Sequence, residues 1–180
     1  MKKYLIISIA IVFGVNASEI VRVTDGDTMI FNAVKTKNGV EHNIKCRIEG
    51  IDTPEKFDSD KLTKFAKKYD ISIDRVKESG KEATNYALAF FSNFNSGNKL
   101  EVTSDSLDVY KRNLCRVKGN GNDYALKILE DGYAVIYESG KYIKDQDYKL
   151  KLIDAQKRAK ETKSGLWQNY SDVMEAMSNY

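Results

Sequence analysis

Two short acidic turns carry the side chains of this sequence that are best suited to chemistry. Residues 52–55 read Asp-Thr-Pro-Glu, so a proline-stiffened turn holds two carboxylates close together, and residues 25–28 read Asp-Gly-Asp-Thr. At an effective dielectric near 20, two carboxylates about 4 Å apart repel by roughly 4 kcal/mol, so a folded chain keeps them together only with a compensating cation. We therefore hypothesise that the two turns meet around one metal ion, with Arg47 beside it.

Each turn alone also has an ordinary structural explanation. Asp-Gly pairs are common in hairpin turns, and residues 52–55 would also suit a capped turn. The combination is more specific, because Arg47 precedes Asp52 by only five residues at the end of an apolar strand.

These motifs resemble the signatures of the staphylococcal nuclease (thermonuclease) family. The first signature is an Asp-Gly-Asp-Thr turn followed by Arg, four residues and Asp-x-Pro-Glu, which residues 25–28 and 47–55 match. The second signature centres on Asp-Lys/Arg-Tyr-Gly-Arg. Residues 108–112 read Asp-Val-Tyr-Lys-Arg, so they keep its Asp, Tyr and Arg but lack its basic residue and its glycine.

The resemblance extends over about residues 19–168, because residues 154–167 also resemble the family's last helix and its tryptophan. Two segments are longer than in the family's best-known member, the hairpin around Asn38-Gly39 and the stretch from Lys56 to Glu78.

The resemblance implies an α+β fold, a five-stranded Greek-key barrel of the OB-fold type with about three packed helices. It also implies calcium-dependent hydrolysis of DNA and RNA phosphodiesters. By motif position, the ligands of the ion would be Asp27, Asp52 and the Thr53 carbonyl oxygen. The catalytic residues would be Glu55, as general base or water-positioning group, and Arg47 and Arg112 on the scissile phosphate. The substrate-binding residues would be Tyr110 and, within one residue of register, Tyr137; Tyr110 could equally be a barrel-edge aromatic.

The residue types suit these roles on physical grounds. Oxygen ligands of this kind prefer a hard cation such as calcium, which acts as a Lewis acid on phosphate. Glu55 lies close to a metal ligand in sequence and could direct a water in line with the leaving oxygen. Two guanidiniums could clamp the equatorial oxygens as charge builds up on them.

The strand pattern indicates how these residues are positioned. Short strands are expected at about residues 20–23, 28–34, 40–48, 99–103 and 112–117, with Asn-Gly at 38–39 as a hairpin turn. Alternation along residues 40–48 puts Val40, His42, Ile44, Cys46 and Ile48 on one face. Cys46 and Arg47 therefore lie on opposite faces of their strand, as do Cys115 and Arg112. If both cysteines face the core, both arginines face outward.

The helical pattern is strongest in the second half of the chain. Residues 56–78 are rich in lysine and acid, and we expect a long loop with one or two helical turns around residues 61–69. Lysines there are usually solvated surface but could guide a polyanion. A helix is expected from a capping box at Ser79 to about Gly97, and others at about 123–131 and 147–163.

The composition indicates one domain, residues 18–180, preceded by a signal peptide. Lys and Arg exceed Asp and Glu by 29 − 26 = +3 among 180 residues, which by itself does not indicate nucleic-acid binding. Residues 1–17 carry two lysines, an apolar run too short to span a membrane and a small-residue cleavage site. We expect a secreted or periplasmic monomer without stable membrane association; an uncleaved anchor is the alternative. Export permits a Cys46–Cys115 disulfide, with two buried thiols as the alternative.

Three classes of function are compatible with these features. The first is an exported calcium-dependent endonuclease that favours single-stranded nucleic acid. The second is a catalytically weak OB-fold nucleic-acid-binding module, which would not need every charged position filled. The third is an interaction domain whose acidic turns merely bind calcium, which leaves both arginines unexplained.

Overall fold

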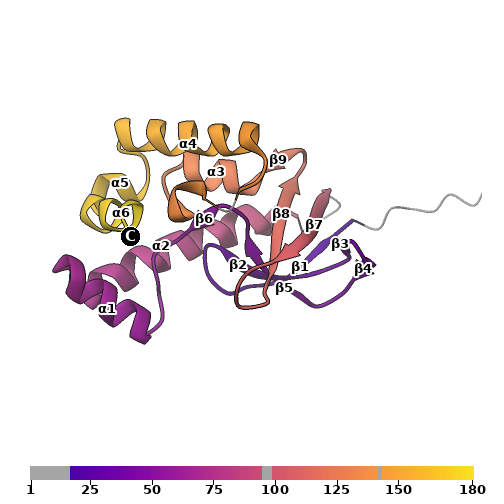
Figure 1. Cartoon of the computed structure of the whole chain (residues 1–180), viewed down its shortest axis with the longest axis horizontal. Helices are drawn as coiled ribbons and strands as arrows, with labels where there is room; N and C mark the ends of the chain where they lie inside the picture. Colours follow the sequence, from indigo (N-terminus) through magenta and orange to yellow (C-terminus); the bar gives the residue numbers. More distant parts are fainter. Residues whose placement is uncertain (1–16, 95–98, 142) are drawn as a thin grey trace, which may run out of the picture.

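The computed structural model describes residues 17–94, 99–141 and 143–180 (Figure 1). The expected signal peptide therefore lies outside the described residues, except for Ala17.

The main sheet has its strands in the order β1-β2-β5-β8-β7-β3-β4, with β9 paired to β8. Their bounds are β1 (Glu19–Val23), β2 (Thr28–Asn32), β3 (Val34–Thr36), β4 (Gly39–Glu41), β5 (Ile44–Ile48), β7 (Leu100–Leu107), β8 (Asn113–Gly119) and β9 (Asn122–Asp123). Strands β2 and β3 are separated only by Ala33, whose φ of 53° bends the chain. Because β2 pairs with β5 and β3 pairs with β7, this bent strand curls the mixed sheet into a partly closed barrel. The expected α+β barrel is confirmed.

The predicted alternation along residues 40–48 is wrong in its first half. Asn43 has a φ of 55°, which separates β4 from β5 and resets the side on which residues face. Val40 is consequently 57% exposed and His42 is exposed, whereas Cys46 and Ile48 are buried as predicted.

The two cysteines face the barrel core and form a disulfide. Strand β5 runs parallel to β8 with Ile48 opposite Cys115, and the Cα atoms of Cys46 and Cys115 are 5.5 Å apart. Of the two alternatives left by the sequence, the bridge is therefore the one found.

The described residues contain six α helices, not the three expected. They are α1 (Asp60–Tyr69), α2 (Ile73–Ser92), α3 (Tyr124–Glu130), α4 (Gln146–Glu161), α5 (Leu166–Asn169) and α6 (Ser171–Ser178). A 3-10 turn, η1 (Tyr137–Gly140), follows a two-stranded ladder of β6 (Ile51–Asp52) and β10 (Val135–Ile136). Helices α3 and α4 match the expected ones closely, whereas α5 and α6 were not predicted.

The segment expected to be a long loop is mostly helical. Ser59 caps α1 by accepting a hydrogen bond from the Leu62 N–H at 3.1 Å, and Ser72 caps α2 by accepting from the Arg75 N–H at 3.2 Å. The predicted start at Ser79 is therefore wrong, because that residue is buried inside α2. Helix α2 ends at Ser92, and the expected end near Gly97 lies outside the described residues.

Helix α2 joins the barrel to a second, all-helical core (Figure 1). Near its C-terminal end, Ala87 and Phe91 are buried in the barrel core with Phe31. Near its N-terminal end, Val76 is buried with Leu62 of α1 and Val173 of α6. Among the described helices, none combines the length and apolar character needed to cross a membrane.

We expect the disulfide to contribute substantially to the free energy of unfolding, because it closes a loop of 69 residues in the unfolded chain. Replacing both cysteines, as in C46A/C115A, should lower that free energy by about 2–4 kcal/mol in urea titrations. Reductant should lower the parent's urea midpoint to about that of C46A/C115A and leave the midpoint of C46A/C115A unchanged. Equal midpoints for the parent with and without reductant would contradict this expectation.

Candidate active site

The two acidic turns of the sequence meet in the structure. The Asp27 Oδ2 atom accepts hydrogen bonds from the Thr53 backbone N–H at 2.9 Å and from the Thr53 hydroxyl at 3.1 Å. Gly26 makes this approach possible, since a Cβ atom there would lie 2.7 Å from the Thr53 Cγ2 atom. The Tyr124 hydroxyl donates to the Gly26 carbonyl at 2.6 Å and so helps to hold the turn in place.

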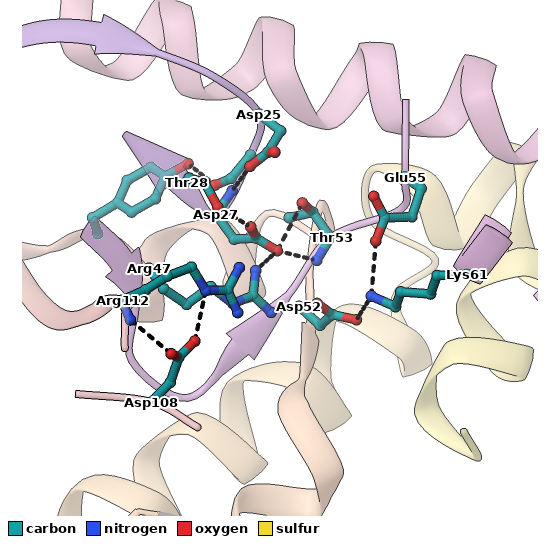
Figure 2. Close-up of polar contacts among 12 residues, drawn as sticks. Asp25, Asp27, Thr28, Arg47, Asp52, Thr53, Glu55, Lys61, Asp108 and Arg112 are labelled. Atoms are coloured by element: carbon teal, nitrogen blue, oxygen red, sulfur yellow. Dashed lines mark hydrogen bonds and ion pairs between the residues drawn. The ribbon is translucent and has the colours of Figure 1, made fainter. Parts of the chain in front are cut away.

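Arg47 lies between the carboxylates of the two turns (Figure 2). Its two terminal nitrogens pair separately with Asp27 and Asp52. Alternation along β5 puts Arg47 on the face opposite Cys46, as predicted, but that face is covered, and Arg47 is only 8% exposed. Arg47 thus lies between the two carboxylates that the sequence predicts as metal ligands.

The cluster holds more negative than positive charge, because Asp25 joins Asp27 and Asp52 around one guanidinium. Burial disfavours the charged form of Asp27, but Arg47 and several hydrogen bonds outweigh it and lower its pKa to about 2. Burial and the nearby Asp27 raise the pKa of Asp25 to about 7. Burial also raises the pKa of Asp52 in spite of Arg47. Arg47 therefore compensates only part of the cluster's charge.

Glu55 is positioned by close packing of its backbone on α2. A Cβ atom at Gly80 would lie 2.6 Å from the Pro54 carbonyl oxygen and 2.7 Å from the Glu55 backbone. Gly80 therefore lets the turn at residues 52–55 rest directly on the helix, which explains why a glycine occurs in the middle of α2.

Lys61 of α1 contacts the Glu55 carboxylate. Its Nζ atom lies 2.8 Å from the Glu55 Oε1 atom and 3.9 Å from the Asp52 Oδ2 atom (Figure 2). Sequence reasoning placed Lys61 in a solvated lysine-rich segment and missed this contact. The Ser59 cap and Asp60 in the first turn of α1 were the signals that could have indicated a helix starting here.

Arg112 is presented by a tight turn built on Asp108. The Asp108 carboxylate accepts from the Tyr110 and Arg112 N–H groups at 2.9 and 2.8 Å and from the Arg112 Nε at 2.6 Å. Lys111 has a φ of 62°, so it adopts the left-handed conformation for which the family's motif uses glycine. The altered motif thus still forms a closed turn.

Arg47 and Arg112 lie on the same face of the sheet. Arg47 is opposite Leu114 in the parallel pairing of β5 with β8, and Arg112 precedes Leu114 by two residues. Figure 2 shows both guanidiniums on the side of the acidic turns.

Each arginine has a tyrosine ring beside it. The Arg47 Cζ atom is 5.7 Å from the ring centre of Tyr137, and the Arg112 Cζ atom is 5.5 Å from that of Tyr110. Tyr110 is 75% exposed, as suits contact with a ligand, and Tyr137 is 37% exposed. Both predicted substrate tyrosines are therefore brought to the site.

The oxygen atoms of Asp27, Asp52 and Thr53 form a donor set of the kind that hard cations prefer. Within the described residues, no three His, Cys, Asp or Glu side chains converge into a complete metal cage. An ion here would therefore need water or substrate oxygens as further ligands.

A larger groove, of about 1160 Å³, runs along β7 and β8 toward α3 and the start of α4. Its lining holds seven carboxylates against five basic side chains. None of the predicted site residues lines this groove, so we place the site at the acidic turns.

Three similarities to known proteins bear on this site. A family model described as "Staphylococcal nuclease homologue" matches residues 45–169, more than half of the chain. The thermonuclease of Staphylococcus hyicus is 28% identical over 158 residues, which are 86% of this chain and 79% of that protein. A probable endonuclease of Komagataella phaffii is 33% identical over 85 residues, or 45% of this chain, and the match spans only 37% of that protein.

The position of Arg47 generates a prediction about stability. The variant R47M leaves two buried carboxylates without their cation, so its free energy of unfolding in EDTA should fall by about 3–5 kcal/mol. The matched variant R112M removes a partly exposed pair with Asp108 and should lose about 1 kcal/mol or less. The free energies of unfolding of both variants are measured by urea titration. Equal losses of free energy in R47M and R112M would show that Arg47 does not hold the two turns together.

Proposed function

The chain belongs to the staphylococcal nuclease homologue family, and on that premise we propose that it is a calcium-dependent nuclease that hydrolyses phosphodiesters of DNA and RNA. The observation that carries this proposal is the pairing of Arg47 with Asp27 and Asp52, which joins two acidic turns beside Glu55 and Arg112. The names of the two relatives, a thermonuclease and a probable endonuclease, agree with it.

The proposed calcium site consists of Asp27, Asp52 and the Thr53 carbonyl, with water and substrate oxygens completing the coordination. This donor set fits calcium, because the ligands are all oxygen atoms and calcium tolerates irregular, partly solvated coordination. The carboxylates around Arg47 also outnumber its single positive charge. When bound, calcium would polarise a phosphate oxygen and offset the repulsion between the carboxylates.

The protein's own side chains would perform the remaining steps. Glu55 would accept a proton from the attacking water and orient that water in line with the leaving oxygen. Arg47 and Arg112 would bind the phosphate oxygens, on which negative charge concentrates in the transition state. Arg47 would have to leave one of its carboxylates to do so.

The proposed substrate features rest on the tyrosine rings beside the two arginines. Tyr110 and Tyr137 would flank the bound phosphate, and their rings could contact neighbouring bases or sugars. We propose that single-stranded or frayed nucleic acid is favoured, because a flexible backbone can bend into such a site and expose its bases to aromatic rings. A binding module without activity is disfavoured, since it would not need Glu55 in the turn that also carries Asp52.

We further propose that the protein acts outside the cytoplasm, secreted or periplasmic, as a monomer without stable membrane association. The Cys46–Cys115 disulfide supports this proposal, because such bonds persist in oxidising compartments.

Removing Glu55 or Arg112 should cripple catalysis without unfolding the chain. We expect E55Q to lower kcat by about 10²–10⁴-fold through loss of proton transfer, and R112Q by about 10²–10³-fold through loss of charge stabilisation. The variants E161Q and R158Q change the same residue types on exposed positions of α4 and should retain the parent rate. Initial rates on single-stranded DNA provide the measurement, and activity of E55Q within tenfold of the parent would refute its assigned role.

Calcium should bind at the acidic turns and be required for cleavage. At a calcium concentration about 100 times its Kd, the free energy of unfolding should rise by about 2.7 kcal/mol. The variant D52N should lose this shift, whereas D58N, at an exposed acid paired with Lys77, should keep it. Chelation with EGTA should abolish cleavage, and full activity with magnesium alone would argue against a calcium site.

A further inference from the structure

Helix α1 carries a concentration of positive charge next to the site. Its ten residues include four lysines and one aspartate, a net charge of 4 − 1 = +3. At 100° per residue, Lys61, Lys64 and Lys68 fall on one stripe at the edge of the buried face formed by Leu62 and Phe65. We call these three residues the lysine stripe.

One end of the lysine stripe lies in the candidate active site. Lys61 contacts Glu55 and approaches Asp52, as described above. A small pocket lined by both carboxylates, by Lys61 and Phe65 of α1, and by Tyr180 after α6 connects the acidic turn to this part of the surface. The stripe therefore continues the site rather than forming a separate patch.

The other end of the lysine stripe is held in place by aromatic rings. The Lys68 Nζ atom lies 4.8 Å from the ring centre of Tyr69 and 4.7 Å from that of Tyr180. The Tyr69 hydroxyl donates to the Asn179 carbonyl at 3.2 Å, which ties α1 to the segment after α6. Lys68 is thus restrained while its position remains exposed.

Lys64, in the middle of the stripe, is exposed and forms no ion pair with any residue that the structure describes. The Asp58 carboxylate, which precedes α1, is paired with Lys77 at 2.9 Å. At 1.5 Å of rise per residue, the stripe extends about 10 Å from Lys61 to Lys68. Lys61 is paired with Glu55, whereas Lys64 and Lys68 form no ion pair within the described part of the chain. A row of ammonium groups of this length suits successive negative charges on an extended strand.

We propose that the lysine stripe is a second substrate subsite, which holds the phosphates of a single strand as it leaves the active site. This inference rests on the proposed nuclease function. A single strand fits better than a duplex, because the stripe is one helix edge wide and starts inside the pocket at Glu55. The subsite is built on α1, which lies within the lysine-rich segment 56–78.

Binding measured apart from cleavage tests the subsite. The probe is a fluorescein-labelled oligothymidylate of about 12 nucleotides, within the usual range of single-strand sites. Its Kd is measured by anisotropy in EDTA between about 50 and 200 mM salt. The variant K64Q/K68Q removes two phosphate contacts, so the slope of log K against log salt should become shallower by about 1.4.

Two further variants make the test specific. The control K157Q/K163Q removes the same charge at exposed positions at and beyond the end of α4 and should keep the parent slope. The variant K64R/K68R should recover most of the slope, because arginine retains the charge.

The outcomes separate the subsite from the proposed function. If the parent cleaves and binds the oligonucleotide but K64Q/K68Q has the parent slope, the subsite is refuted and the nuclease stands. If the parent neither binds nor cleaves nucleic acid, the proposed function falls and the subsite with it. Binding of the parent and of K64Q/K68Q to anionic lipid vesicles is measured as well. If K64Q/K68Q binds the oligonucleotide as the parent does but no longer binds the vesicles, the stripe recognises a membrane surface and the proposal is overturned.

Discussion

The structure depends on one buried arginine that pairs with carboxylates from two separate turns. Arg47 contacts Asp27, before β2, and Asp52, after β5, so a single guanidinium joins segments 25 residues apart in the chain. Moving three charged groups out of water is costly, and the pairing repays that cost only because the partners also make hydrogen bonds. Asp27 obtains these from Thr53. Under the proposed function, the same constraint would also supply the chemistry. Carboxylates gathered around too little positive charge would accept a cation, and a guanidinium released from them could bind phosphate.

The barrel and the helices each contribute one part of this arrangement. Strand β5 carries Cys46 toward the core and Arg47 toward the site, so the disulfide to β8 fixes the strand that presents the arginine. Gly26 lets the first turn touch Thr53, and Gly80 lets the second turn rest on α2. Helix α1 then places Lys61 on Glu55. Two close backbone approaches and one rigid strand thus determine where the functional side chains lie.

Much of the site was predictable from the sequence, because motif spacing and strand alternation are local properties. The meeting of the two acidic turns and the inward direction of both cysteines follow from alternation along two strands and from the resemblance to a known family. The failures have physical causes. Ala33 and Asn43 adopt positive φ values without being glycine. The bend at Ala33 carries no sequence signal, and the bend at Asn43 carries only the weak one that asparagine tolerates this conformation. Ser79 has capping-box spacing, but Ser72 caps the helix because Val76 must reach the core shared with α1 and α6. The contact of Lys61 with Glu55 depends on that tertiary packing.

Under the two proposals, the acidic turns would bind one phosphate of the substrate and the lysine stripe would bind the next ones. The proposed mechanism requires that Arg47 exchange one of its carboxylate partners for a phosphate oxygen when calcium binds. A crystal structure of the protein with calcium and a phosphorothioate dinucleotide tests this claim most directly. We predict an anomalous peak for the ion between Asp27 and Asp52, with the Arg47 guanidinium turned onto a phosphate oxygen. An Arg47 that still bridges both carboxylates, with the ion bound elsewhere, would contradict the account.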